Sequence, residues 1–352
     1  MSAQEQSIVD SSEDKTPWRR PNFILNEFFT QNEPAFRKLT AIREKGWQNP
    51  RGDDYFKRQR RVADGAKGKM AAGLYKMMQE IGDEMHKSTR CLSPQPNCEG
   101  KMDILDICMA PGGYTASALK HNPGATAFGI SLPPQQGGHK VLLPRHRSTM
   151  RLLDVTMLAK EYGVEEIPIA HPDRTSFLDE RPFLDQTFQL IFCDGQVLRT
   201  HERAEYRENH EARRLTVSQL ILALQRIRAG GTIVVLLHKI EKWETFELLY
   251  RFSQFSSVQV FKPAKKHAKR SSSYLVASGV QPDTDAAKLL VEEWKQAWWQ
   301  ATFGGENGTG DRGSTADEDH VRLVLDQFGS QFIELARPIW EIQEKALSSW
   351  NP

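Results

Sequence analysis

Two charged residues directly follow apolar runs, and they are the first candidates for chemistry in this chain. Asp194 ends the run 190–193, and Lys239 follows the run 233–238. If both runs are parallel strands of one sheet, their carboxyl ends meet at the same edge, so the two charges would lie close together. A lysine of lowered pKa can accept a proton from a hydroxyl group while a carboxylate orients it. Charged residues also occur at strand ends without any function, so the spacing alone leaves both interpretations open.

A glycine-rich turn follows the apolar run 104–109. It reads Ala110-Pro111-Gly112-Gly113 and leads into a segment with helical character. Glycines let a ligand approach the backbone where any Cβ would obstruct it, and ligands of open α/β sheets bind at the carboxyl end of the first strand. The turn is not the GxGxxG pattern, and no phosphate-binding Lys-Ser/Thr follows it, so NAD and nucleoside triphosphates are poor candidates. An ordinary tight turn before a helix is the alternative.

Apolar runs and helical segments alternate from about residue 100 onward. Runs typical of strands occupy 104–109, 125–130, 188–193, 232–237, 258–261 and 274–277. The segment 215–228 has the apolar spacing of a helix packed on a sheet, with Gly230 and Gly231 as its C-cap. This order predicts an α/β fold: a Rossmann-like, doubly wound, mostly parallel sheet with helical N-terminal and C-terminal extensions.

The composition divides the chain into four segments. Residues 1–21 are polar and acidic and are predicted to be a disordered tail. Residues 22–99 form a helical N-terminal region, residues 100–280 the α/β domain, and residues 281–352 a helical C-terminal extension. Trp294 and Trp298 share one face of a helix in that extension. The low-complexity stretch 304–319 is predicted to be a flexible linker.

The composition is typical of a soluble, intracellular globular protein. The 352 residues are 39% hydrophobic and 26% charged, with a net charge of +2. No apolar run is long enough to cross a bilayer, so no membrane association is predicted, and the first twenty residues lack the apolar core of a signal peptide. The four cysteines have no zinc-knuckle spacing, so we expect them to be reduced, and no metal site is predicted. Nucleus and cytoplasm are both open.

The stretch from Asp106 to Tyr114 (DICMAPGGY) resembles motif I of the FtsJ-like RNA 2′-O-ribose methyltransferases, where it holds the methionine part of S-adenosylmethionine. The resemblance covers about residues 69–279 and implies the class I methyltransferase fold with S-adenosylmethionine as cofactor. The cofactor-binding residues that it implies are Asp106, Cys108, Ala110, Pro111, Gly112, Gly113, Tyr114, Ser131, Asp154 and Asp194. Asp154 would meet the adenine. Ser131 stands where the family usually has an acidic ribose partner, so the cofactor would be held less firmly.

The same resemblance assigns the catalytic residues. The family uses a Lys–Asp–Lys–Glu set, and Lys76, Asp194 and Lys239 match its first three members. Lys239 would accept the 2′-hydroxyl proton, with Lys76 and Asp194 positioning it, because two neighbouring lysines lower the pKa of one of them. Ser272 occupies the place of the glutamate. The activity would therefore be altered or lost.

Basic clusters flank this predicted site on both sides. One cluster precedes the last strand and consists of Lys262, Lys265, Lys266, Lys269 and Arg270. The other consists of residues 57–61 with Lys67 and Lys69 and leads into the Lys76 helix. Such cations bind RNA phosphates, although solvated basic loops are also common. Trp243 can either stack on a base or pack in the core.

The sequence therefore predicts an S-adenosylmethionine-dependent enzyme that methylates ribose 2′-hydroxyls of RNA. Ribosomal RNA, and with it rRNA processing, and mRNA caps are both open as substrates, RNA is the expected partner, and protein partners are undetermined. One alternative is a methyltransferase-like, RNA-binding scaffold without catalytic activity, which Ser131 and Ser272 favour. The other alternative is a methyltransferase that acts on protein or small molecules. The set of Lys76, Asp194 and Lys239 argues against it.

Overall fold

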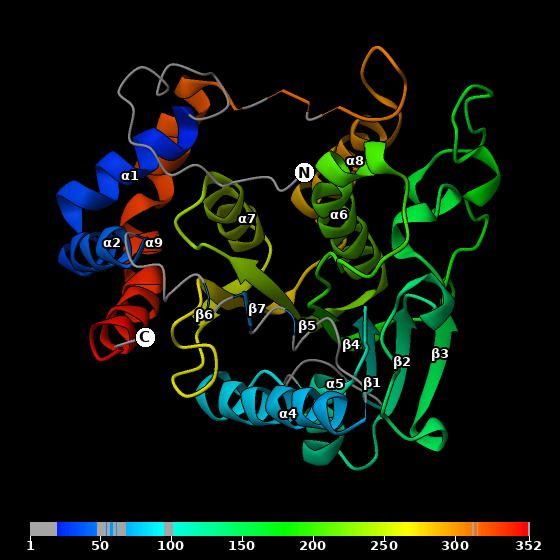
Figure 1. Ribbon diagram of the computed structural model, residues 1–352, viewed down its shortest axis with the longest axis horizontal. Coiled ribbons are helices and arrows are strands. Elements are labelled where there is room, and N and C mark those ends of the chain that lie inside the picture. Colours follow the sequence, from blue (N-terminus) through cyan, green and yellow to red (C-terminus); the bar gives the residue numbers. More distant parts are fainter. Residues whose placement is uncertain are drawn as a thin grey trace.

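A seven-stranded sheet forms the centre of the molecule (Figure 1), in the order β3-β2-β1-β4-β5-β7-β6. The computed structural model describes residues 20–47, 54, 57, 58, 61, 68–94, 101–311, 313, 314 and 316–350. The strands are β1 (Asp103–Ile107), β2 (Thr126–Ser131), β3 (Ser148–Leu152), β4 (Phe188–Cys193), β5 (Ile227–His238), β6 (Ser257–Phe261) and β7 (Ser272–Val280). Strands β1 to β5 pair in parallel, and β7 runs antiparallel to both of its neighbours, β5 and β6. The predicted doubly wound, mostly parallel sheet is confirmed.

The two faces of the sheet are covered by different helices. The helices α4 (Lys69–Thr89) and α5 (Gly113–His121) cover one face, and α6 (Glu208–Arg226), α7 (Trp243–Ser253) and α8 (Asp285–Phe303) cover the other (Figure 1). A hydrophobic core lies on each face of the sheet, and alternate residues of each central strand contribute their side chains to one core or the other. On β4, Leu190 and Phe192 pack toward α4 and α5, while Ile191 packs toward α6 and α7. The continuous apolar run of β4 is thus a strand buried on both faces.

One predicted boundary is wrong. The α6 helix ends at Arg226, and β5 begins at the next residue, Ile227. Gly230 and Gly231 therefore lie inside β5 rather than at a helix C-cap. Gly230 has a φ of 81°, and the pairing with β7 shifts register directly after Gly231. Gly230 provides the left-handed residue of a β-bulge, the same conformation that a helix C-cap needs.

The predicted helical extensions from the two ends of the chain pack together. They are α1 (Arg20–Asn32), α2 (Pro34–Trp47) and α9 (Glu318–Ser348). The ring of Phe29 in α1 lies 5.1 Å from the Phe332 ring and 5.4 Å from the Trp340 ring of α9, measured between centroids. All three residues belong to the core that also contains Phe246 of α7. The extensions are therefore part of the main hydrophobic core.

The remaining segments are loops and short 3-10 helices. These helices are η3 (Pro134–Gln136), η4 (Arg145–Arg147), η5 (Val155–Met157), η6 (Lys160–Tyr162), η7 (Arg174–Ser176) and η8 (Glu205–Arg207). The start of the predicted linker folds back on α8, because the Asp311 N–H donates to the Gln300 carbonyl at 3.0 Å. Residues 1–19 of the predicted tail lie outside the described residues, as do Arg60 and Lys67 of the basic cluster, whereas Lys57, Arg58, Arg61 and Lys69 are described and exposed. In the described part of the chain, every helix is too short or too polar to span a membrane.

Candidate functional site

A cavity of about 280 Å³ lies at the carboxyl ends of β1, β2, β3 and β4. This is the edge at which open α/β sheets bind their ligands. The residues that line it are Leu74, Met78, Cys108, Ala110, Ile130, Ser131, Leu132, His139, Leu153, Asp154, Val155, Thr156, Asp194, Gly195, Gln196, Val197, Leu198, His201, Glu211 and Leu215. Aliphatic side chains dominate, with a few polar groups among them. Such a lining suits a partly apolar ligand of small-molecule size.

Half of the residues predicted to bind the cofactor line this cavity. They are Cys108, Ala110, Ser131, Asp154 and Asp194. The others, Asp106, Pro111, Gly112, Gly113 and Tyr114, are absent from the lining. Tyr114, for example, is buried in the core and shares a hydrogen bond with the hydroxyl of Tyr274. Within the motif 106–114, Cys108 and Ala110 therefore face the cavity, and the other predicted residues support its wall from behind.

The two motif glycines have different roles. Gly112 has a φ of 97°, a left-handed conformation that favours glycine. A Cβ on Gly113 would lie 2.4 Å from both the Tyr75 carbonyl oxygen and the Met78 Cβ. Gly113 therefore allows α4 to cross closely over the start of α5. The sequence predicted that a ligand approaches this glycine closely. In the structure, α4 makes the close approach at Gly113.

Asp106 and Asp194 form a pair of poorly compensated acids. Asp106 is buried on β1, where Thr115 donates a hydrogen bond to its Oδ2. The Oδ1 atoms of Asp106 and of Asp194 are buried without a hydrogen-bond partner in the part of the chain that is described. Burial raises the pKa of Asp106 to about 7. Burial, and then the proximity of Asp106, raise the pKa of Asp194 well above its ordinary value. A ligand cation next to Asp194 would relieve both effects.

The predicted catalytic residues of β5 and β7 lie side by side. Lys239 directly follows β5, and its N–H donates to the Ser271 carbonyl at 3.0 Å. Ser272 begins β7, opposite His238. Because β5 is also the neighbour of β4, Asp194 and Lys239 follow adjacent parallel strands at the same edge. Within the described residues, no ion pair joins Asp194 to Lys239.

The structure does not bring Lys76 toward the cavity. Its side chain is exposed on α4, whereas Leu74 and Met78, two positions away on either side, line the cavity. Side chains two positions apart on a helix point in nearly opposite directions. The α4 helix thus contributes apolar side chains to the cavity and presents Lys76 to solvent.

Ser131 and Asp154 line the cavity from β2 and from the segment after β3. Ser131 is buried at the end of β2. Both oxygens of Asp154 are already engaged: the N–H and hydroxyl of Thr156 donate to Oδ1, and Arg207 donates to Oδ2 at 3.1 Å. Burial alone would raise the pKa of Asp154, but the hydrogen bond from His201 and the charge of Arg207 hold it well below its usual range. The predicted adenine contact would have to compete with these partners.

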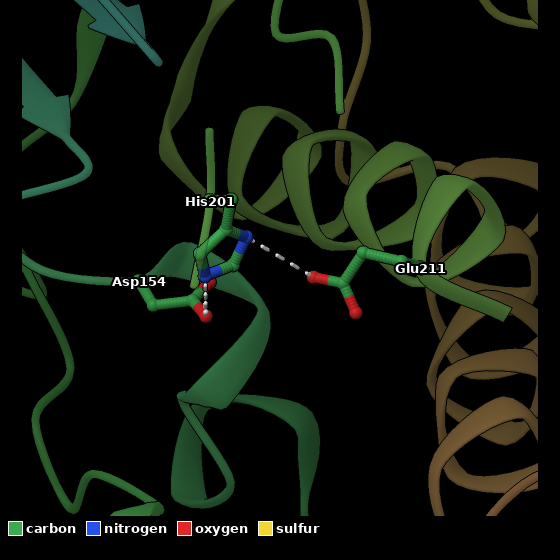
Figure 2. A group of neighbouring side chains, drawn as sticks. All are labelled: Asp154, His201 and Glu211. Carbon is green, nitrogen blue, oxygen red and sulfur yellow. Dashed lines mark ion pairs between the residues drawn. The ribbon is translucent and has the colours of Figure 1, made fainter. Parts of the chain in front are cut away.

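A cluster that the sequence reasoning missed adjoins Asp154. Figure 2 shows the imidazole of His201 between two carboxylates, with Nε2 3.4 Å from Asp154 Oδ2 and Nδ1 3.9 Å from Glu211 Oε1. Arg207 lies 2.9 Å from Glu211 Oε1, and Arg214 lies 3.3 Å from Glu211 Oε2. The arginines supply the positive charge that a metal ion would otherwise supply to these acids. The only sequence signal was the density of His, Arg and Glu between β4 and α6, which no motif marks.

The predicted RNA-binding residues separate into two groups. Lys265, Lys266 and Arg270 are exposed in the loop between β6 and β7, where Lys266 pairs with Glu80 of α4 at 3.3 Å. Lys269 is half-buried, with its ammonium 4.7 Å from the centre of the Trp350 ring. This loop lies at the same sheet edge as Lys239, since it joins the end of β6 to the start of β7.

Lys262 does not belong to that surface. It is only 3% exposed, and its Nζ donates to the carbonyls of Arg270, at 2.6 Å, and Ser272, at 3.0 Å. Burial lowers its pKa to about 7. The prediction that Lys262 contacts RNA is therefore wrong, because its amine holds the loop together from inside.

Trp243 was predicted either to stack on a base or to pack in the core. It is buried and packs against Phe246, so it is a core residue.

Residues 75–280 match the family model described as FtsJ-like methyltransferase. No curated protein matches the chain. Among solved structures, a putative ribosomal RNA methyltransferase from Plasmodium falciparum is similar at 19% identity, covering 57% of this chain and 96% of that one, with a TM-score of 0.38. An rRNA methylase from Streptococcus thermophilus is similar at 12% identity, covering 58% of this chain and 95% of that one, with a TM-score of 0.34.

Proposed function

The chain belongs to the FtsJ-like methyltransferase family, whose cofactor is S-adenosylmethionine, and from that premise we propose that it methylates ribose 2′-hydroxyls of RNA. The observation that carries the proposal is the placement of Asp194 and Lys239. They follow adjacent parallel strands, and Asp194 lines the cavity with a carboxylate oxygen that has no partner among the described residues. An acid and a lysine at one sheet edge suit an acceptor that must lose a proton.

The residues around the cavity fit the cofactor. S-Adenosylmethionine carries its reactive methyl group on a positively charged sulfonium and has an ammonium group as well. Asp194, with Asp106 behind it, is an acid without a partner beside the cavity in the described part of the chain, and a cationic ligand would stabilise its ionised form. Ser131 offers one hydroxyl to the ribose, which is less than a carboxylate offers. Ile130 and Leu153 provide apolar surface for the adenine ring.

The hydroxyl acceptor depends on Lys239. In the proposed scheme, the Lys239 amine accepts the 2′-hydroxyl proton, and Asp194 orients that amine. Ser272 cannot replace the carboxylate that the family places there, so Lys239 has less negative charge beside it. Lys76 enters the scheme from the exposed side of α4, where the RNA would reach it first. The basic loop of Lys265, Lys266 and Arg270 supplies cations for the RNA backbone.

Substitution of Lys239 tests the proposal directly. Lys239→Ala should lower methyl transfer to RNA by at least about 100-fold, because a general base contributes about that much. Calorimetric titration with S-adenosylmethionine should show unchanged cofactor binding in the same variant. Lys242→Ala, an exposed lysine three residues further on, is the matched control and should keep its activity. A Lys239→Ala variant as active as the wild type would contradict the scheme.

A non-catalytic, RNA-binding scaffold is the second candidate. Three observations favour it: Ser131 and Ser272 replace acids of the family pattern, and Lys76 points away from the cavity. A scaffold of this kind would bind RNA but transfer no methyl group, even with saturating S-adenosylmethionine. Tritium transfer from labelled cofactor into a pool of unmodified transcripts separates the two candidates. Resistance to alkaline hydrolysis of the phosphodiester bond that follows the labelled nucleotide would identify the 2′-O-methyl product.

A further inference from the structure

The segment from Gly195 to Arg203 closes one side of the cavity. It leaves β4 directly after Asp194, and Gln196, Val197, Leu198 and His201 line the cavity from it. We call residues 195–203 the roof segment. It precedes η8 and contains no helix or strand of its own. Its position must therefore be fixed by side chains and by neighbouring loops.

One set of contacts ties the roof segment to the loop after β2. The Thr200 hydroxyl donates to the Gly137 carbonyl at 2.8 Å, and the Glu202 N–H donates to the Gln136 carbonyl at 3.2 Å. These bonds join two loops, and both belong to the rim of the cavity. They cannot by themselves anchor the roof segment to the rigid sheet, because hydrogen bonds between loops move with the loops.

Both ends of the roof segment are held by α6, because the Gly195 N–H donates to Gln219 Oε1 at 2.8 Å and Arg203 lies 2.7 Å from Glu208 Oε2. His201 connects the middle of the roof segment to the rigid part. Its Nε2 lies 3.4 Å from Asp154 Oδ2, at the end of β3, and its Nδ1 lies 3.9 Å from Glu211 Oε1, on α6 (Figure 2). The His201 side chain is 9% exposed, so these contacts are shielded from solvent. Both acids are held in turn by Arg207, which fixes their positions. One imidazole thus joins the roof segment to a strand end and to a helix.

We propose that His201 is a positioning residue of the cofactor site, which holds the roof segment closed over the end of the cavity beside Asp154. With the roof segment in place, Val197 and Leu198 line the same cavity as Ile130 and Leu153. A flat, apolar ring such as adenine can then lie between aliphatic side chains. Asp154 serves this arrangement as the anchor of His201, since its oxygens are already engaged by the protein. The inference rests on the assignment of this cavity to the cofactor.

Cofactor binding by the full chain tests the inference. His201→Ala should weaken the binding of S-adenosylmethionine by about tenfold or more, since it removes both contacts to the buried acids. His201→Gln keeps a side-chain donor and should recover part of the affinity. At saturating cofactor, the turnover of both variants should stay close to that of the wild type, because the effect is confined to binding. His146→Ala, an exposed histidine before β3, is the matched control and should bind like the wild type.

Hydrogen exchange gives a second readout that does not depend on activity. The amides of residues 196–203 should exchange faster in His201→Ala than in the wild type, both without and with cofactor. Equal affinity and equal exchange in the two proteins would overturn the inference while leaving the proposed function intact. If the wild type itself binds no S-adenosylmethionine at millimolar concentration, the cavity is not the cofactor site, and both proposals fall.

Discussion

Asp106 and Asp194 stand at the ends of neighbouring strands, and each keeps one carboxylate oxygen out of solvent without a partner in the described structure. Ionising either group in that environment is costly, because burial disfavours the charged form and each acid repels the other. The raised pKa of Asp106, about 7, expresses this cost. A cationic ligand would offset it. The acids therefore make the ligand-free fold less stable at neutral pH and the liganded fold comparatively more stable.

The pH dependence of stability provides a test at the residue scale. The pKa of Asp106 rises from its ordinary value of 3.8 to about 7 on folding, so the folded state binds a proton that the unfolded state has already lost. The free energy of unfolding should therefore fall as the pH rises from about 4 to about 7. Asp106→Asn should flatten this decrease by roughly 2–4 kcal/mol. Urea denaturation of both proteins across this range measures the difference, and parallel curves would contradict it.

Some residues of the site follow from the sequence, and others do not. Asp194 and Lys239 were predictable because each directly follows an apolar run, which fixes its place at a strand end. His201 was not, since its contacts come from segments that the chain order does not bring together until the sheet forms. For Lys262 the sequence led to a wrong prediction. A lysine in a basic run looks exposed, yet its stem is long enough to turn its amine inward to backbone carbonyls.

At the scale of elements, the crossing of α4 over the start of α5 determines one wall of the cavity. Gly113→Ala would place a Cβ 2.4 Å from the Tyr75 carbonyl oxygen and the Met78 Cβ, so α4 would have to move away. We expect the free energy of unfolding to fall by about 1–3 kcal/mol, as for other overpacked sites. Cofactor affinity should fall as well, because Met78 lines the cavity. Chemical denaturation and calorimetric titration measure the two effects.

Gly73→Ala is the matched control on the other partner of this crossing. Gly73 lies inside α4, and a Cβ added to it would have no atom of the described chain within 4 Å beyond its own helix backbone and chain neighbours. Alanine should therefore stabilise the helix by about 0.5–1 kcal/mol through its higher helix propensity. If Gly113→Ala behaved like Gly73→Ala, the close crossing would not exist in solution.

Buried strands could be predicted from the sequence, whereas the exposed edge strand could not. The strands β1, β2 and β4 were predicted from their apolar runs because the sheet buries both of their faces. No apolar run marked β3 (STMRL), because it is an edge strand with largely exposed side chains. The Gly230–Gly231 pair misled the prediction, since a C-cap and a β-bulge require the same left-handed glycine conformation.

At the scale of the molecule, the C-terminal extension supports the cavity. Trp298 of α8 is fully buried, and its Nε1 donates to the Thr156 carbonyl at 3.0 Å, next to the anchor Asp154. Trp298→Ala should lower the free energy of unfolding by about 3–5 kcal/mol, and it should weaken cofactor binding. Trp299→Ala removes a side chain that is 46% exposed on the same helix, and should cost less than about 1 kcal/mol. Equal effects of the two substitutions would mean that α8 is not docked as described.

The proposed binding of RNA would have to rest on local surfaces, because the net charge of the whole chain is only +2. If Lys265 and Lys266 each contact one phosphate, their joint replacement by alanine should make the slope of log affinity against log salt shallower by about 1.4–1.8. Lys288→Ala, an exposed position on α8 across the sheet, should leave the slope unchanged. Filter binding of an unmodified transcript over a series of salt concentrations gives these slopes. An unaltered slope in the double variant would place the RNA on another face, and the exposed side of α4 around Lys76 would be the next surface to substitute.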